Sequence, residues 1–225
     1  MNILVLDTSS VYASCAVFKE ENIVAERVQK NGLVHSKSVM TLVEGCLESA
    51  MLDISEIDVF GVVAGPGSFT GVRIGVCAIK GLAQALDKPV YAVNTLDCLK
   101  ENITTEKYVC PILDARRGQV YTAVYKDGER VFDHTACPIE EVMAFLSDKE
   151  SVFLGDGVDT FREKITDFLK EKASFAKKQH NYIRAASGVE EVLKALEEGR
   201  LISAAALDAI YLRIPQAERE YEKLH

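Results

Sequence analysis

Apolar and polar positions along the chain predict two successive units that share one order of elements. Each unit starts with three strands, whose apolar residues run continuously or alternate with polar ones, and then alternates helices with strands. For the first unit, the predicted elements are strands at 2–7, 11–18 and 22–29, a helix at 34–50, a strand at 57–64, a helix at 70–86, a strand at 89–93 and a short helix at 95–102. For the second unit, they are strands at 108–114, 119–125 and 129–134, a helix at 138–147, a strand at 151–155 and a helix at 158–170, followed by a weaker pattern with helices near 188–198 and after 203.

A short internal repeat supports the division into two units. The stretch from Leu6 to Phe18 has the same spacing as the stretch from Leu113 to Tyr125, and each predicts a strand, a turn and a second strand. Three antiparallel strands followed by alternating helices and strands are typical of a ribonuclease-H-like unit, and two such units form the actin-like architecture; pure alternation would have favoured a doubly wound sheet. The sequence therefore predicts an actin-like α/β protein, with one subdomain at 1–103, a second at 104–206, and residues 207–225 packing back on the first.

Composition and charge restrict the function classes. With 34 acidic and 26 basic residues, the chain carries a net charge of −8, which argues against an independent grip on nucleic acid because phosphate binding requires a basic face. No apolar run approaches the roughly 20 residues of a membrane span, and the sequence runs directly into a strand without a basic leader. We therefore expect a cytoplasmic protein without membrane association, in which the cysteines are reduced.

A glycine-rich stretch at 65–75, GPGSFTGVRIG, lies between a predicted buried strand and a predicted helix. A strand, a glycine loop and a helix N-terminus often hold an anion. No lysine follows these glycines, however, and their spacing is G-x-G-x-x-x-G, so the stretch matches neither of the common nucleotide-binding loops. The alternative is a tight turn whose glycines allow close helix packing, with Ser68 or Thr70 as the N-cap.

Residues 65–75 also resemble the G-P-G-S-F-T-G-x-R-x-G element of the TsaB family. Three further segments agree with that family, namely LVLDTS at 4–9, DARRGQVY at 114–121 and YLR at 211–213, so the resemblance spans essentially the whole chain. It implies an actin-like fold and a non-catalytic, accessory role in the bacterial machinery that transfers a threonylcarbamoyl group to the adenosine next to the tRNA anticodon. The implied partners are a TsaD-like catalytic subunit and a TsaE-like ATPase, with tRNA contacted indirectly through the complex, and a homodimer is left open.

The first hairpin of each unit is where active members of this architecture hold ATP phosphates and magnesium, by an aspartate near a glycine. Asp7 and Asp114 occupy these positions, but the phosphate-binding glycine is missing from its usual place in both hairpins. Ser9, Arg116 and Gly155 complete the candidates for a degenerate nucleotide cleft, although turn chemistry explains Arg116 and Gly155 as well. An independent ATP-dependent small-molecule kinase that uses the two aspartates is therefore the alternative to the accessory subunit.

Patterns for metal binding and catalysis are missing from the sequence. TsaD proteins carry an H-x-x-x-H pair of metal ligands on a helix, whereas no two of the four histidines here lie within five residues of each other, and the corresponding segment at 93–99 contains none. Ser68 lies on a strand–loop–helix turn but lacks the G-x-S-x-G pattern of a hydrolase nucleophile. We expect no bound metal, no cofactor and no catalytic residue.

Two predicted helices carry more apolar or small residues than one buried face requires. The helix at 70–86 has only two charged residues, which predicts burial on two sides, and the helix at 34–50 has a stripe of small residues beside its apolar stripe. The two helices could pack only on each other and on the sheet. The resemblance instead favours a partner surface, since TsaB pairs with TsaD through helices of this part of the fold. The residues predicted to bind the partner are Ser38, Thr41, Gly45, Ser49, Gly71, Arg73, Gly75 and Lys80.

Overall fold

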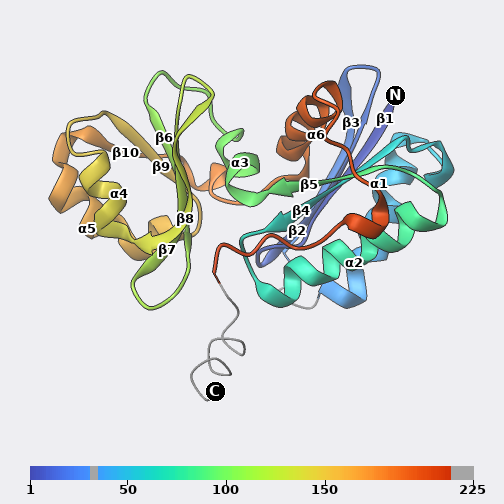
Figure 1. Ribbon diagram of the computed structural model, residues 1–225, viewed down its shortest axis with the longest axis horizontal. Helices are drawn as coiled ribbons and strands as arrows, with labels where there is room; N and C mark the ends of the chain where they lie inside the picture. The colour runs from blue at the N-terminus through green and yellow to red at the C-terminus, as the bar shows by residue number, and fades with distance from the viewer. Residues whose placement is uncertain (31–34, 214–225) are drawn as a thin grey trace, which may run out of the picture.

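Two five-stranded sheets form the core of the computed structural model, which describes residues 1–30 and 35–213 (Figure 1). The strand order is β3-β2-β1-β4-β5 in the first sheet and β10-β9-β6-β7-β8 in the second. In each sheet the first three strands pair antiparallel and the last two join in parallel, so the two sheets have the same topology. The predicted actin-like α/β fold with two ribonuclease-H-like units is confirmed.

The element bounds follow the predicted order closely. The first unit contains β1 (Asn2–Asp7), β2 (Tyr12–Lys19), β3 (Asn22–Lys30), α1 (His35–Ala50), β4 (Val59–Gly65), α2 (Phe69–Ala85), β5 (Val90–Asn94) and α3 (Thr95–Lys100). The second contains β6 (Tyr108–Asp114), β7 (Gln119–Lys126), β8 (Glu129–Pro138), α4 (Ile139–Phe145), β9 (Ser151–Leu154), α5 (Gly157–Leu169) and β10 (Ala173–Phe175). The short strand β10 was not predicted from the sequence. The helix predicted after 203 is wrong for the described residues, because only a single 3-10 turn forms there, at Ala204–Ala206.

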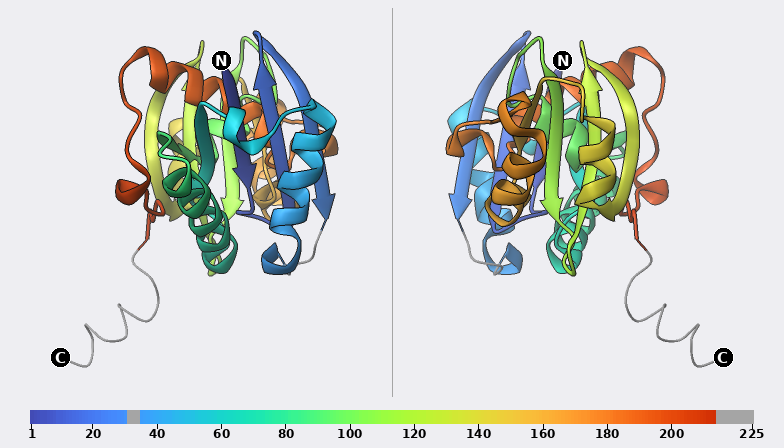
Figure 2. Two further views of the ribbon diagram at one scale, coloured as in Figure 1. Left: turned by 90° about the vertical axis from the view of Figure 1, so that its right-hand side faces the viewer. Right: turned by 90° about the vertical axis from the view of Figure 1, so that its left-hand side faces the viewer.

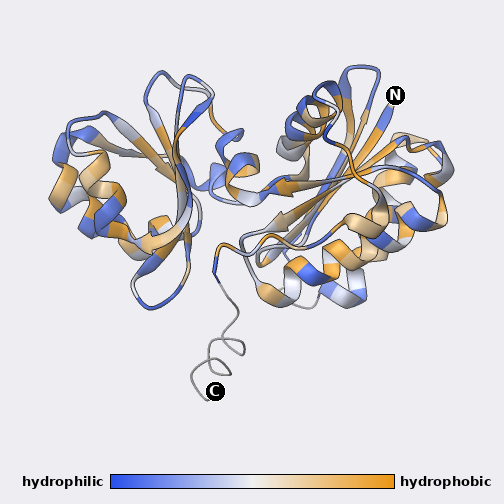
Figure 3. Cartoon of the chain, in the orientation of Figure 1, coloured by the Kyte–Doolittle hydropathy of each residue, from blue (hydrophilic) through white to orange (hydrophobic). Residues whose placement is uncertain are grey.

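The central strand β1 is buried on both faces, which explains its continuous apolar run. Leu4 and Leu6 pack into the core that α1 and α2 cover, and these two helices lie side by side on one face of the sheet (Figure 2). Ile3 and Val5 pack on the opposite face against α6 (Gly188–Glu197). Figure 3 shows the corresponding pattern, with hydrophobic residues concentrated on the strands and on the inward sides of the helices.

The C-terminal part of the chain returns to the first sheet well before residue 207. Ile183 and Val189 belong to the core around β1, and Ile202 forms a bridge with Val90 at the edge of the sheet. Further on, the backbone N–H of Ile210 donates to the carbonyl of Ala64 at 2.7 Å. We therefore propose that the first subdomain comprises residues 1–103 together with a return segment that starts near 183.

Two glycines of α2 allow the helix to lie unusually close to the end of β1. A Cβ atom at Gly71 would lie 2.1 Å from the backbone oxygen of Thr8, and one at Gly75 would lie 2.5 Å from its Oγ1. The Thr8 hydroxyl in turn donates to the carbonyl of Gly71 at 2.7 Å. These glycines are therefore required for internal packing of the helix on the sheet.

Replacing Gly71 with alanine is expected to lower the free energy of unfolding by about 3 kcal/mol, the upper end of the usual cost of overpacking, because a backbone carbonyl cannot move aside as a side chain can. Gly81→Ala in the same helix is the control, since a Cβ there meets no described atom within 4 Å. That change should stabilise the chain by about 0.5–1 kcal/mol. Urea unfolding of both variants measures the difference, and equal stabilities would contradict the close contact with Thr8.

Candidate functional site

A cleft of about 320 Å³ lies where the two units meet, at the carboxyl ends of β1 and β6. The first unit contributes its hairpin and the loop before α2, and the second contributes its own hairpin and the start of α5. The lining residues are Ser9, Ser10, Val11, Gly67, Ser68, Leu113, Asp114, Ala115, Arg116, Tyr121, Asp156 and Ile183. The structure thus brings together three of the five residues predicted for a nucleotide cleft, Ser9, Asp114 and Arg116.

Asp7 lies beneath this cleft and does not line it. Its side chain is fully buried, and its Oδ1 accepts hydrogen bonds from the backbone N–H of Ser9 at 2.9 Å and from the Ser9 hydroxyl at 2.6 Å. Its Oδ2 has no hydrogen-bond partner among the described residues. Burial raises the pKa of Asp7 to about 7, although the two bonds from Ser9 act in the opposite direction. The carboxyl group that would hold a metal–phosphate pair is therefore covered by Ser9 and partly protonated at neutral pH.

Asp114 stabilises the turn of the second hairpin. Its Oδ1 accepts from the backbone N–H of Arg116 at 2.8 Å, and its Oδ2 lies 3.4 Å from Nη1 of the same residue. The Arg116 side chain is 86% exposed, and its backbone has a positive φ of 65°. The turn chemistry that was kept as an alternative thus accounts for the backbone of Arg116, while its guanidinium is the one cation among the described residues that line the cleft.

The predicted residue Gly155 supports the cleft from behind. A Cβ atom there would lie 2.3 Å from the carbonyl oxygen of Ile112, and φ is 108°, so only glycine fits without strain. The next residue, Asp156, lines the cleft, and its Oδ1 accepts from the backbone N–H of Asp114 at 3.0 Å. Burial raises the pKa of Asp156. Asp156 was not among the site residues predicted from the sequence, although it lies in the same LGDG turn at 154–157 as Gly155.

The glycine-rich loop lies at the edge of the cleft and contacts the first hairpin. Ser68 is the N-cap of α2, since its Oγ accepts from the backbone N–H of Gly71 at 3.3 Å, and its own N–H donates to the carbonyl of Ser9 at 2.7 Å. A Cβ atom at Gly67 would lie 2.5 Å from the same Ser9 oxygen. The loop glycines therefore serve close packing, and Ser68 rather than Thr70 caps the helix.

Chemically, the cleft offers two carboxylates, one guanidinium and several hydroxyls. Among the described lining residues, a polyphosphate would meet Asp114 and Asp156 with Arg116 as the cation. A second guanidinium lies beside the lining, because Arg213 Nη1 donates to the carbonyl of Ala115 at 3.2 Å. Within the described residues, no three His, Cys, Asp or Glu side chains are placed to hold a metal ion that could offset the two acids. We therefore expect the cleft to bind Mg-ATP poorly.

We expect calorimetry to give a dissociation constant for Mg-ATP weaker than about 10 μM, equivalent to less than about 7 kcal/mol of binding free energy. Asp114→Asn is the informative variant, because it removes one carboxylate from the cleft. Tighter binding that this variant abolishes, together with phosphoryl transfer to a small molecule, would instead support the kinase alternative.

The predicted partner stripe on α1 is partly covered by β3. A Cβ atom at Gly45 would lie 2.3 Å from Nη1 of Arg27, and the same guanidinium donates to the Ser49 hydroxyl at 3.0 Å. Gly45 was predicted as part of a partner surface, which would leave it exposed in the lone chain. It is buried instead, because a long side chain from the neighbouring strand lies across it. Thr41 is exposed and Ser38 is half-buried.

The predicted partner residues of α2 point in different directions. Gly71 and Gly75 face Thr8 and not the outer surface. Lys80 donates to the carbonyls of Ala205 and Leu207 at 3.0 Å, so it holds the return segment.

Arg73 lies on the outer face of α2. Its guanidinium stacks on the Phe69 ring at 3.8 Å, and its Nε donates to the Tyr211 hydroxyl at 2.8 Å. Cys77 and Gly81 continue the exposed line of this helix at successive steps of four residues, so Arg73, Cys77 and Gly81 form one exposed stripe along α2. Exposed residues beside this stripe are Phe69, Thr70, Gln84 and Ala85.

Among the described residues, no helix is both long enough and apolar enough to cross a bilayer.

Comparisons with known proteins give a consistent result. The family described as "TsaD: tRNA N6-adenosine threonylcarbamoyltransferase" matches residues 22–218. The chain is 32% identical to the tRNA threonylcarbamoyladenosine biosynthesis protein TsaB of Bacillus subtilis (strain 168), over 98% of both chains, and 25% identical to that of Haemophilus influenzae, over 95% of this chain and 94% of the other. The solved structure of YeaZ from Pseudomonas aeruginosa superposes with a TM-score of 0.80 at 25% identity, and covers 94% of this chain and 99% of its own.

Proposed function

The chain belongs to the TsaB family, and we propose on this basis that it takes part in tRNA threonylcarbamoyladenosine biosynthesis as a non-catalytic subunit in the cytoplasm. In this role it binds and organises a TsaD-like catalytic subunit, which a TsaE-like ATPase joins. The complex transfers a threonylcarbamoyl group to the adenosine next to the tRNA anticodon. The observation that carries the proposal is the similarity to TsaB over 98% of both chains.

Two features of the structure support an accessory role. The cleft between the units presents the acidic side chains of Asp114 and Asp156 where a phosphate would lie. Asp7 is buried beneath Ser9 and does not reach the cleft. Both features disfavour phosphoryl transfer at this place in the fold. The outer face of α2 carries few charges, with Cys77 and Gly81 exposed, which suits close approach of another helix. The net charge of −8 fits a subunit that leaves contact with tRNA to its partners.

Reconstitution tests the proposal directly. The TsaD-like subunit of the same organism is incubated with threonylcarbamoyl-adenylate and unmodified tRNA, with and without this chain. We expect transfer to tRNA to require both proteins, and this chain alone to transfer nothing. Full transfer by the TsaD-like subunit alone, or failure of the two proteins to co-elute, would overturn the accessory role.

A further inference from the structure

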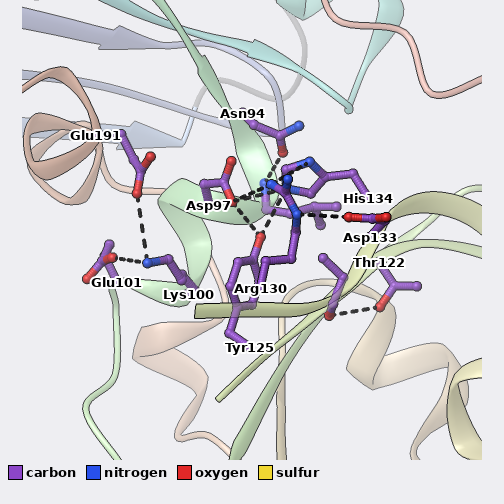
Figure 4. A network of polar contacts seen from close by, with 12 residues as sticks. Asn94, Asp97, Lys100, Glu101, Thr122, Tyr125, Arg130, Asp133, His134 and Glu191 are labelled. Carbon is purple, nitrogen blue, oxygen red and sulfur yellow. Dashed lines mark hydrogen bonds and ion pairs between the residues drawn. The ribbon is translucent and has the colours of Figure 1, made fainter. Parts of the chain in front are cut away.

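A polar network joins the two units at a place distant from the cleft, and the sequence analysis did not foresee it (Figure 4). Asp97, on the first turn of α3, is its centre. The Tyr125 hydroxyl of β7 donates to Asp97 Oδ1 at 2.6 Å, and His134 Nε2 of β8 lies 3.0 Å from the same oxygen. The Tyr125 hydroxyl and His134 Nε2 are also 3.1 Å apart, so the three side chains form a closed triangle.

Charged side chains from both units surround this triangle. Arg130 of β8 places Nη1 at 3.9 Å from Asp97 Oδ1 and 3.3 Å from Nδ1 of His134. On the other side, Lys100 of α3 lies 3.8 Å from Glu191 of α6 and 5.4 Å from the centre of the Tyr125 ring. The network therefore links α3 and α6 of the first unit to the β7–β8 hairpin of the second.

The triangle is largely withdrawn from water. The side chains of Asp97 and His134 are each 16% exposed, and Tyr125 is 2% exposed. Burial alone would raise the pKa of Asp97, but the hydrogen bonds from His134 and Tyr125 and the charge of Arg130 lower it below its usual value, so the group is ionised at neutral pH. Hydrogen bonds to an ionised acceptor in such surroundings are strong and directional.

The apolar contact between the units lacks this directionality. Leu96 and Leu99 of α3 pack on Val109, Leu113 and Ala123 of the second sheet. Hydrophobic burial depends on area and not on angle, so this contact holds α3 against the sheet but permits small rotations. The bonds to Asp97 add direction to this apolar contact, because they depend on the angle between donor and acceptor.

The register of the second hairpin connects the network to the cleft. Tyr125 pairs with Val109 at one end of the β6–β7 ladder, and Val120 pairs with Asp114 at the other end. Asp114 lies five residues after Val109, which is a distance of about 16 Å along the strand at about 3.3 Å per residue. Because the paired strands move together, holding Tyr125 also sets the position of Asp114 opposite Ser9.

We propose that Asp97, Tyr125 and His134 form a latch that fixes the angle between the two units and thereby the width of the cleft. The inference does not depend on the proposed function, since it concerns the geometry of the lone chain. Opening the latch permits the second unit to rotate on the apolar face of α3.

Spin-label distance measurements test the latch on the full chain. Cys77 on α2 is exposed and the other five cysteines are buried, so one label attaches to Cys77 and a second to Thr166→Cys on the exposed side of α5. Labelled protein is diluted with unlabelled chain so that any self-association adds no distances. The latch variants are Asp97→Ala and Tyr125→Phe, which remove the central acceptor and one of its donors.

We expect both variants to shift or broaden the distance distribution by about 5 Å, the scale of movement that a unit rotation of about 15° produces. Asp133→Ala is the matched control, because Asp133 pairs with the same Arg130 at 3.3 Å, but its side chain is 94% exposed and takes no part in the bonds to Asp97. It should leave the distribution unchanged.

An unchanged distribution in Tyr125→Phe, in protein whose circular dichroism melt shows a folded chain, would overturn the latch. An equal shift in Asp133→Ala would overturn it as well. Should Asp97→Ala fail to fold, Tyr125→Phe decides alone, since it retains the ring and removes only the hydroxyl.

Discussion

The Asp7→Asn variant is expected to become more stable than the wild-type chain, by a margin that grows as the pH rises from about 4 to about 7. Asp7 is fully buried, and burial raises its pKa from 3.8 to about 7. Between these two values the folded state keeps a proton that the unfolded state has lost, so the stability of the wild-type chain falls as the pH rises through this window. A shift of about three units corresponds to about 4 kcal/mol.

Asparagine reproduces the protonated form and does not titrate. Its Oδ1 can accept the two bonds that Ser9 donates to Asp7, and its amide occupies the place of the unpartnered Oδ2. Urea unfolding at pH 4.5, 6 and 7.5 measures the difference between the two chains. It should be small at the lowest pH, increase through the window and level off above pH 7.

Asp53→Asn is the control, because the hydrogen bonds from Ser55 lower the pKa of that exposed carboxyl. A carboxyl whose pKa is lower in the folded state stabilises the folded chain at every pH above its pKa in the unfolded state. This contribution is lost only as the pH falls toward the pKa in the folded state, which lies below the pH window of Asp7. A constant difference between Asp7→Asn and wild type from pH 4.5 to 7.5 would mean that Asp7 is ionised in the folded chain.

The order of elements could be predicted because it depends on local pattern. The repeat from Leu6 to Phe18 and from Leu113 to Tyr125 gives two strands with a turn in each unit, and both hairpins form with the expected antiparallel pairing. The N-cap of α2 could be narrowed to Ser68 or Thr70 because an N-cap depends on its immediate neighbours, and the structure has Ser68.

Contacts between distant segments were beyond the sequence analysis. A small residue such as Gly45 has the same helical position whether solvent, a partner or a side chain covers it, and here Arg27 from a neighbouring strand does so. The bond between Tyr125 and Asp97 joins residues 28 positions apart in different units, and no periodic pattern marks either residue. The same applies to the return of the chain at Ile183, which depends on the shape of a core already formed.

For the candidate cleft, the two hairpins could be predicted from the sequence, but the burial of the aspartate in each hairpin could not. Asp7 and Asp114 occupy equivalent positions in the repeat, yet Asp7 is fully buried while Asp114 lines the cleft. The difference comes from the residues that follow. Ser9 folds back on Asp7 with two hydrogen bonds, whereas Arg116 turns its side chain outward.

The outer face of α2 should carry the contact with the TsaD-like subunit, and Gly81→Glu is expected to weaken that association by at least about 100-fold. A charge placed in an interface must be desolvated without a partner or must hold the partner away, which costs several kcal/mol. The lone chain should not be destabilised, because Gly81 is exposed and a Cβ there meets no described atom within 4 Å. Glutamate also favours a helix over glycine, by about 0.5 kcal/mol.

Gly81→Glu is a sharper probe than a charge at Gly45, where Arg27 lies against the site and could pair with the new carboxylate.

Thr41→Glu, at an exposed position of α1, tests whether the interface extends to the neighbouring helix. Thr166→Glu on α5 of the other unit is the matched control, since it adds the same charge at an equally exposed helical threonine. Titration calorimetry of each variant with the TsaD-like subunit gives the affinity, and circular dichroism melting of the lone chain gives its stability. Wild-type affinity in both Gly81→Glu and Thr41→Glu would place the interface away from α1 and α2, while a loss of affinity in Thr166→Glu alone would assign it to the second unit.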